Sequence, residues 1–399
     1  MTLEFTSDVL IVGAGPAGST AAALIARGGH SVTVLEKSDF PRFQIGESLL
    51  PSCLPILERL GIEPKTDSHL FKRGAQFLCE RTGRSQIFDF GEGLDGCPSH
   101  AWQVDRTEFD QRLVAQAKSD GARVEFGCKV TSAELTDDSV VVSTKTGTFS
   151  GRYLVDATGQ DRLLARHFGT AVPTQYGGSA AAYTHYTDLG DAAWAELEPE
   201  FDVRILIVDG GWAWVIPLPG RRMSVGIVTR ERGADRARID AYVADSPLVR
   251  RLASGATRGE SAVVRNFGFK NERPHGARFG CIGDAAGFID PVFSSGVTLA
   301  MNGAAALADR LNVALESGTE ADPNLMAKPS AHVGRGLDTF RAVVHRFYRT
   351  RFVDHFIFMA PQSGDMRRGV VSVLAGDVWR DDNIFQRMLL TSRTIRGGA

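Results

Sequence analysis

The sequence predicts an α/β fold: a parallel sheet flanked by helices, a separate antiparallel sheet, and a short helical segment at the C-terminus. Three observations in its 399 residues predict this fold. A buried apolar strand over 8–12 runs directly into a glycine-rich turn. Alternating strand patterns, separated by a turn signal, occupy 204–228. Apolar residues with helical spacing follow at 337–347.

Composition limits the possible classes of function. Hydrophobic residues make up 43% of the chain and charged residues 23%, which is the balance of a folded globular protein. The 45 Lys and Arg against 47 Asp and Glu give a net charge of −2, which argues against nucleic acid as the main partner. No apolar run is long enough to span a membrane, and the N-terminus lacks the basic start of a secretory signal. We therefore expect a cytoplasmic protein.

The cysteines and histidines predict neither a disulfide framework nor a metal site. The five cysteines are scattered, without a C-x-x-C pair, and the nine histidines form no H-x-x-x-H cluster. We expect buried free thiols in a reducing compartment.

The first element is a strand–turn–helix unit typical of dinucleotide binding. The strand over 8–12 is followed by Gly13-x-Gly15-x-x-Gly18, and 19–26 predicts a helix of small residues. In this motif the first glycine makes the tight turn, the second lets the backbone approach a pyrophosphate, and the third lets helix and strand pack closely. The pyrophosphate would then lie at the positive end of the helix dipole.

A second strand, over 31–35, ends in an acid that is placed to accept hydrogen bonds from ribose hydroxyls. A glycine motif by itself is weak evidence, but strand, motif, helix, strand and acid in this order predict a dinucleotide site. The alternative is a glycine-rich turn without a ligand. The residues predicted to hold the cofactor here are Gly13, Gly15, Pro16, Ala17, Gly18, Glu36 and Lys37.

Two downstream segments resemble flavoproteins rather than nicotinamide enzymes. The segment 280–287 resembles a second strand-to-loop-to-helix element, in which Asp284 matches the acid that contacts the ribityl chain of a flavin. The segment 153–159 resembles the strand that closes the nucleotide fold. With the N-terminal motif, both resemble the superfamily of two-dinucleotide-binding flavoproteins. The resemblance implies FAD and a Rossmann-like domain of the p-hydroxybenzoate hydroxylase or glutathione reductase type.

Within that superfamily, four stretches resemble the flavin-dependent halogenases. Trp212-Ala213-Trp214-Val215-Ile216-Pro217 matches their W-x-W-x-I-P signature, and 72–77 matches K-x-G-A-x-F. The segment 41–51 is similar to the loop after the second strand in the branch that acts on phenols, pyrroles and carrier-bound substrates. The segment 290–296 matches the flavin-facing stretch where halide is held.

The resemblance implies a mechanism and assigns residues to it. Reduced FAD, supplied by a separate flavin reductase, would form a hydroperoxide that oxidises chloride or bromide to hypohalous acid. Trp212 and Trp214 would keep the substrate away from the flavin, while Lys72 would deliver the halogen through a dry tunnel. Halide would bind at backbone N–H groups of Ser295 and Gly296. The remaining cofactor-binding residues would be Arg42, Ser48, Arg106, Asp284, Pro291 and Gly296.

Each residue taken alone has a structural alternative. Trp212 and Trp214 alternate along a strand and could be core residues of one face. Lys72 could be a solvated loop residue, and the serines before the 297–301 helix could belong to a turn. An ion pair is as consistent with Glu47 and Arg42 as a role at the flavin.

Three other functions stay open. One is an FAD-dependent reductase or dehydrogenase resembling the geranylgeranyl reductases, whose Y-x-W-x-F-P signature is close to W-x-W-x-I-P. Another is an aromatic monooxygenase of the p-hydroxybenzoate type, although Ala157-Thr158-Gly159 replaces the Asp-Gly pair of those enzymes. The last is a flavin-binding protein without catalysis.

The predicted organisation is discontinuous. An FAD-binding domain would take 1–75, 100–172 and 265–325, and a β-rich substrate domain 76–99 and 173–264. A C-terminal helical region would take 326–399. The branch usually carries a longer C-terminal region over the substrate site, so we expect a mouth that is open or completed by a partner.

Overall fold

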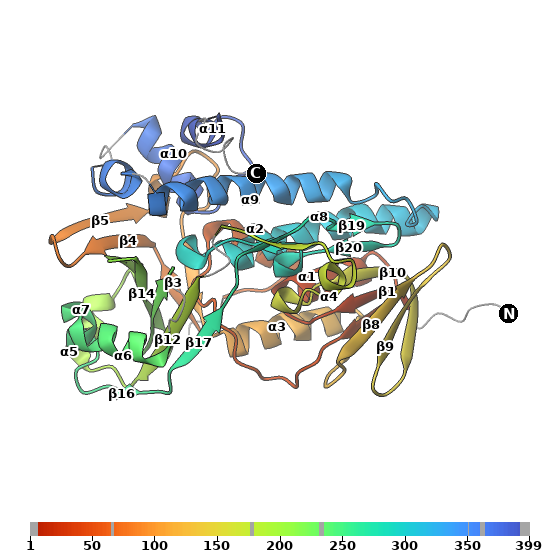
Figure 1. The fold of residues 1–399 in the computed structure, drawn as a ribbon, viewed down its shortest axis with the longest axis horizontal. Helices are drawn as coiled ribbons and strands as arrows, with labels where there is room; N and C mark the ends of the chain where they lie inside the picture. Colours follow the sequence, from red (N-terminus) through yellow and green to blue (C-terminus); the bar gives the residue numbers. More distant parts are fainter. Residues whose placement is uncertain are drawn as a thin grey trace.

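A computed structural model describes residues 7–64, 68–175, 179–230, 235–349, 351–359 and 364–391. Its first layer is a parallel sheet with the strand order β20-β10-β1-β2-β7 (Figure 1). The sheet is continued by β19, and by β9 and β8 through a meander on β10. Its strands are β1 (Ser7–Val12), β2 (Val32–Leu35), β7 (Arg123–Glu125), β8 (Val130–Leu135), β9 (Val140–Thr144), β10 (Thr148–Asp156), β19 (His275–Gly276) and β20 (Phe279–Cys281).

Helices pack on this sheet. α1 (Pro16–Arg27) contacts both α3 (Arg106–Ser119) and α8 (Ser295–Ser317). Alanines supply much of the shared core, which lets the helices lie close to β1 and β10. The shorter helices nearby are α2 (Leu54–Leu60) and α4 (Leu163–His167).

A second sheet holds both motif tryptophans, and we call it the tryptophan sheet. Its order is β16-β12-β15-β14-β13-β4-β5, with β17 also paired to β12. All its pairs are antiparallel except β4 with β13, which run parallel. Its strands are β4 (Gly74–Cys79), β5 (Arg84–Asp89), β12 (Ala180–Thr187), β13 (Val203–Val208), β14 (Gly211–Leu218), β15 (Arg222–Thr229), β16 (Thr257–Arg258) and β17 (Ala262–Arg265).

The two faces of the tryptophan sheet are buried by different helices. Ala213 and Val215 face α5 (Asp191–Leu197), α6 (Arg236–Asp245) and α7 (Pro247–Leu252). Trp212, Trp214 and Ile216 point to the other face, as the period of two along a strand requires. That face is covered by α9 and the elements after it.

The C-terminal elements are α9 (Ala327–Arg349), the π-helix η6 (Val353–Phe358), α10 (Asp365–Leu374) and α11 (Ile384–Thr391). α9 lies along α8 and carries the chain back toward the tryptophan sheet (Figure 1). Phe340, Val343 and Phe347 are buried, which confirms the predicted helical spacing. Residues 392–399 of the predicted helical region lie outside the described residues.

Short elements connect these layers. β3 (His69–Lys72) pairs with β6 (Ala101–Val104), and β11 (Ala171–Pro173), β18 (Phe269–Asn271) and β21 (Gly287–Phe288) form a small sheet. The short turns of helix are η1 (Pro51–Cys53), η2 (Phe90–Glu92), η3 (Gly159–Asp161), η4 (Gly283–Ala285) and η5 (Pro291–Phe293).

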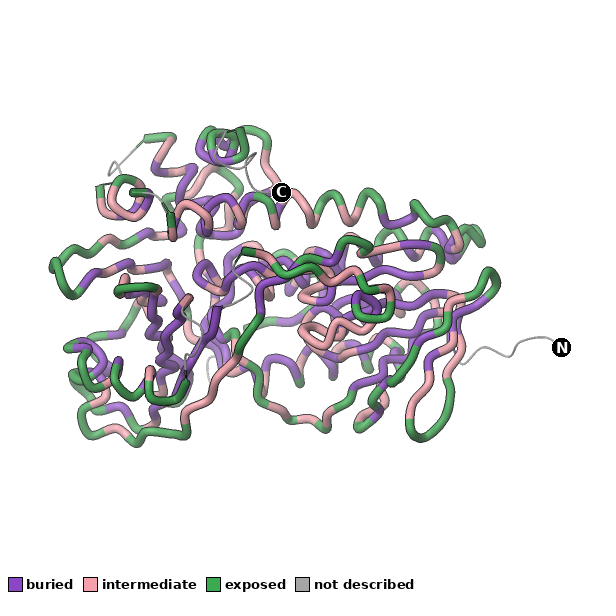
Figure 2. The backbone as a smooth tube through the Cα atoms, viewed as in Figure 1, coloured by how far each residue is buried: buried purple, intermediate pink, exposed green. Residues whose placement is uncertain are grey.

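Figure 2 shows the central strands of both sheets buried, with exposed residues at hairpin tips and outer helix faces. The α/β fold predicted from the sequence is confirmed, while the domain boundaries remain a prediction. No helix among the described residues is long and apolar enough to cross a membrane. All five thiols are free, and four of them are buried.

Candidate active site

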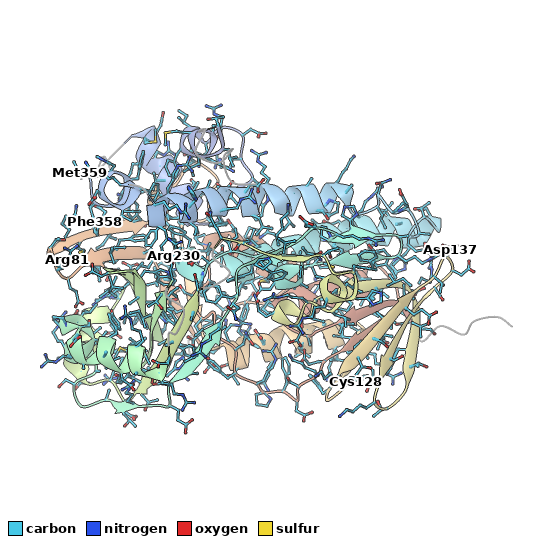
Figure 3. All side chains as sticks on the ribbon, in the orientation of Figure 1. Arg81, Cys128, Asp137, Arg230, Phe358 and Met359 are labelled. Atoms are coloured by element: carbon cyan, nitrogen blue, oxygen red, sulfur yellow. The ribbon has the colours of Figure 1, made fainter. Side chains whose placement is uncertain are left out.

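One cavity of about 1140 Å³ extends between the parallel sheet and the tryptophan sheet. Cys128, which Figure 3 labels near the start of β8, also lines the cavity. The predicted residues that line the cavity are Gly13, Gly15, Pro16, Ala17, Glu36, Lys37, Arg42, Ser48, Arg106, Trp212, Trp214, Asp284, Pro291 and Gly296. Gly18, Lys72 and Ser295 do not line it.

The three glycines of the N-terminal turn have different roles: two allow close packing, and one lines the cavity. A side chain on Gly13 would overlap the Ala157 carbonyl, and one on Gly18 would overlap the Gly13 carbonyl. These two glycines therefore serve the close packing of strand, turn and helix. Gly15 instead lines the cavity, and a Cβ there would meet only an Arg42 side-chain nitrogen, at 3.6 Å. The N-terminus of α1 behind it has no side-chain cap and no acidic residue in its first turn. This end of the cavity is therefore suited to an anionic pyrophosphate.

Glu36 stabilises this turn with two hydrogen bonds and also lines the cavity. Its carboxylate accepts the Ala14 N–H at 2.8 Å and the Ser38 N–H at 2.9 Å. Each carboxylate oxygen has further lone-pair capacity for a hydroxyl. Lys37 is exposed beside it and forms an ion pair with Asp161.

Arg42 and Arg106 share one buried acid rather than pairing with Glu47. Asp110 binds Arg106 through two hydrogen bonds, at 2.8 and 2.9 Å, and lies 3.3 Å from Arg42. Arg106 also donates to the carbonyls of Ile45 and Gly46. It therefore fixes the loop that precedes Ser48.

Asp284 lines the cavity, and Gln160 donates to its carboxylate at 3.0 Å. Burial raises the pKa of this carboxyl, while the Gln160 hydrogen bond and the charges of Arg106 and Arg162 act in the opposite direction. The predicted helix does not follow directly; the chain first forms η4 and β21, and α8 starts at Ser295.

The two tryptophans form one wall of the cavity. Their ring centroids are 5.6 Å apart, and both side chains are buried. The indole of Trp214 donates to Ser224 at 3.1 Å, and Gly226 on β15 leaves the space that this ring fills. The indole N–H of Trp212 has no well-aligned acceptor, although it is near enough to Asp290 to lower the pKa of that carboxyl. The residues thus belong to the core and to the cavity wall together.

Lys72 is fully buried at the end of β3, which excludes the solvated-loop alternative. Its Nζ donates to Ser48 Oγ and to the Leu49 carbonyl, both at 2.8 Å, and lies 5.2 Å from the Phe90 ring. No carboxylate of the described chain lies within ion-pair distance of it. Burial lowers the pKa of Lys72 to about 7, against an opposing effect of Asp202 and Cys53. A neutral amine therefore exists near pH 7.

The C-terminal helices pack on the element next to this lysine, while the mouth that is open or completed by a partner stays a prediction. α10 packs on η2, whose Phe90 shares a buried cluster with Val370 and Leu374. Lys72 has no solvent-exposed surface. Ser48, which is buried and lines the cavity, lies between the amine and the cavity.

The segment 290–296 forms a turn against the cavity. Ser294 adopts a left-handed conformation (φ 54°) and gives the first turn of α8 no side-chain cap, and that turn contains no acid. Gly296 lines the cavity, whereas Ser295 is buried just behind it. The backbone N–H groups at this helix start can receive an anion.

Sequence reasoning missed several partners: Asp110, Gln160 and His185 each hold a residue of the cavity wall. Glu47, which the sequence offered either for the flavin pocket or for an ion pair, lines the cavity and accepts from His185 Nε2 at 2.7 Å. Nothing in the sequence marks His185. Among the described residues no group of His, Cys, Asp and Glu gathers as for a metal ion.

The cavity, glycine turn and fold define a dinucleotide-binding flavoprotein, and the sequence profile of the FAD binding domain matches residues 6–330. The chain is 31% identical to the flavin-dependent halogenase armH3 of Armillaria mellea, over 97% of this chain and 84% of that protein. It is 27% identical to the 1H-pyrrole-2-carbonyl-[peptidyl-carrier protein] chlorinase of Pseudomonas fluorescens, over 93% and 89%. The crystal structure of a flavoprotein/dehydrogenase from Cytophaga hutchinsonii is similar, with 30% identity, a TM-score of 0.86 and 96% of each chain covered.

The chain belongs to the flavin-dependent halogenase family. It is therefore an FAD-binding oxidoreductase, as the sequence motifs predicted.

Proposed function

We propose that this enzyme oxidises chloride or bromide and transfers the halogen, through Lys72, to an electron-rich substrate. The observation that carries the proposal is a buried amine with a pKa of about 7, one hydroxyl away from the flavin cavity. A structural lysine would gain nothing from such burial, because desolvation disfavours its charged form.

The residues fit FAD. The uncapped start of α1 and the open space at Gly15 suit the pyrophosphate, Glu36 suits a ribose, and Asp284 suits the ribityl chain. When bound, reduced FAD and oxygen supply the oxidant for halide. The reduced cofactor would come from a separate flavin reductase, because the chain contains no second recognisable nucleotide motif.

The halide is proposed to lie at the start of α8, on backbone N–H groups of Ser295 and Gly296. Trp212 and Trp214 fill the cavity wall and exclude a larger substrate, while a halide ion is small enough to pass. The neutral Lys72 amine then takes the halogen from hypohalous acid, releasing water. It passes the halogen to an aromatic carbon: the N–halogen bond breaks, a C–halogen bond forms, and the proton lost by that carbon restores the Lys72 amine.

A phenol, a pyrrole or a carrier-bound ring is the proposed substrate class. The similarity to a pyrrole chlorinase that acts on a peptidyl carrier protein supports the carrier-bound form. Such rings react with electrophilic halogen without further activation, so the enzyme needs only to position them.

The test supplies the enzyme with FAD, a flavin reductase with NADH, bromide, and an electron-rich phenol or pyrrole probe. Wild type should brominate the probe. Lys72→Ala should bind FAD and consume oxygen as before but lose bromination by at least about 100-fold, the scale of removing an essential catalytic group. Lys145→Ala, at an exposed lysine, is the matched control. Normal bromination by Lys72→Ala would refute the role of this lysine.

A second candidate is an FAD-dependent reductase or dehydrogenase. The similarity to the flavoprotein/dehydrogenase structure favours it. That activity needs neither halide nor oxygen, so reduction of an alkene probe under anaerobic conditions, with no bromination in air, would select it over the halogenase.

A further inference from the structure

Asp290 is a buried acid that the proposed mechanism does not use. Its side chain is 1% exposed and directly precedes η5. One oxygen accepts the Val292 N–H at 3.0 Å, which caps this turn from within. The other accepts the Tyr348 hydroxyl at 3.0 Å. A single carboxyl thus joins the 291–296 turn to the last turn of α9.

The position of this turn matters because its backbone faces the cavity. Pro291, Val292, Ser294 and Gly296 all line it. Ser294 holds a left-handed conformation that costs a non-glycine residue free energy, so other contacts must hold the turn in place. The bonds of Asp290 provide two of those contacts.

The environment of Asp290 keeps its carboxyl able to accept these two hydrogen bonds. Burial raises the pKa of Asp290 to about 6, while the hydrogen bonds from Val292 and Tyr348, the nearby Trp212 indole and the charge of Arg230 oppose that rise. Arg230, labelled in Figure 3, lies between the tryptophan sheet and α9, with its guanidinium 5.3 Å from the Tyr348 ring. Near neutral pH the carboxyl is therefore mostly ionised and able to accept both bonds.

We propose that Tyr348 is a positioning residue for the halide site, acting through Asp290 on the 291–296 turn. This inference rests on the proposed function only for the identity of the ligand at Ser295 and Gly296. It gives the C-terminal helices a second task besides covering Lys72: they set the geometry of the cavity turn.

Tyr348→Phe removes only the hydroxyl, and two measurements follow its effect. The KM for bromide should rise about threefold to tenfold, the worth of one net hydrogen bond, while kcat changes by less than about twofold. Hydrogen–deuterium exchange of the peptide covering 290–297 should become faster in the FAD-loaded enzyme. Tyr242→Phe, which removes a buried hydroxyl in α6, is the matched control and should change neither.

Asp290→Asn separates positioning from folding. It keeps an acceptor for the Val292 N–H and a polar partner for Tyr348, so its KM should lie between those of wild type and Asp290→Ala. Unchanged exchange and unchanged KM in Tyr348→Phe would overturn the inference, as would effects equal to those of Tyr242→Phe. Faster exchange in an enzyme that brominates nothing would support the coupling and refute the halogenase proposal instead.

Discussion

The pKa of Lys72, the residue proposed to deliver the halogen, is lowered by its buried surroundings rather than set by direct contacts with acids. Its ammonium form has two neutral oxygen acceptors and an aromatic face, which replace only part of the hydration it loses. Asp202 acts on it from a distance and raises its pKa. The fraction of neutral amine at a given pH should therefore respond to that one carboxylate.

The pH dependence of bromination should follow this amine. Because the neutral form is the one proposed to take the halogen, the rate should rise with pH through about 7. Asp202→Asn removes a charge that raises the pKa of Lys72, so the rising limb should move to lower pH. Asp202 also forms an ion pair with Arg73, and so does Glu200, at 3.4 Å. Glu200→Gln is therefore the control: it weakens an ion pair of Arg73 but should leave the pH dependence of the rate unchanged. Identical profiles for wild type and Asp202→Asn would contradict this account.

The same burial predicts a stability effect. In the unfolded chain Lys72 binds its proton up to about pH 10.5, whereas the folded protein releases it above about 7. Its burial penalty is thus largest below pH 7 and falls as pH rises toward 10.5. Lys72→Met should raise the free energy of unfolding above that of wild type. This difference between variant and wild type should shrink by up to about 3 kcal/mol from pH 6 to pH 9. Chemical denaturation at both pH values measures it; an advantage that grows with pH would exclude the mechanism.

Elements built from local signals were predictable from the sequence, and those built from distant pairing were not. The strand, glycine turn and helix over 7–27 follow from contiguous residues, and they form as expected. The burial of Lys72 depends on pairing of β3 with β6 and on α10, nearly 300 residues later. The Glu47–His185 contact likewise joins a loop to β12. No local pattern encodes such neighbours.

The tryptophan strand depends on its neighbour β15 for the shape of the cavity wall. A Cβ at Gly226 would overlap the Trp214 indole, so Gly226→Ala should displace the ring and cost about 1–3 kcal/mol of stability. Thermal unfolding and tryptophan fluorescence should both change. Gly334→Ala in α9, where a Cβ meets nothing, is the control and should be neutral or slightly stabilising. Equal effects at the two glycines would show that the wall is not tightly packed.

At the scale of the whole molecule, the C-terminal helices pack over the face of the tryptophan sheet that carries Trp212 and Trp214. Arg367 joins α10 to β5 of the tryptophan sheet and to η2. Its buried side chain donates to Glu92 at 3.0 Å and to the Ile87 carbonyl at 2.7 Å. Its guanidinium also stacks on the Phe88 ring. A buried guanidinium with these partners is costly to remove, because the groups it satisfies are left unpaired. We therefore expect that a substrate larger than halide reaches Lys72 when this cover opens.

Opening of the cover can be measured on Lys72 itself. With an amine-acylating reagent and mass spectrometry, folded wild type should label Lys72 at least about 100-fold more slowly than the exposed Lys145, because labelling requires local opening. Arg367→Ala should speed labelling of Lys72 about tenfold or more and leave Lys145 unchanged. Arg368→Ala removes a neighbouring exposed ion pair with Asp95 and should have little effect. If Arg367→Ala labels Lys72 no faster than wild type, the helices are not the barrier, and the route to the amine must pass through Ser48 and the flavin cavity.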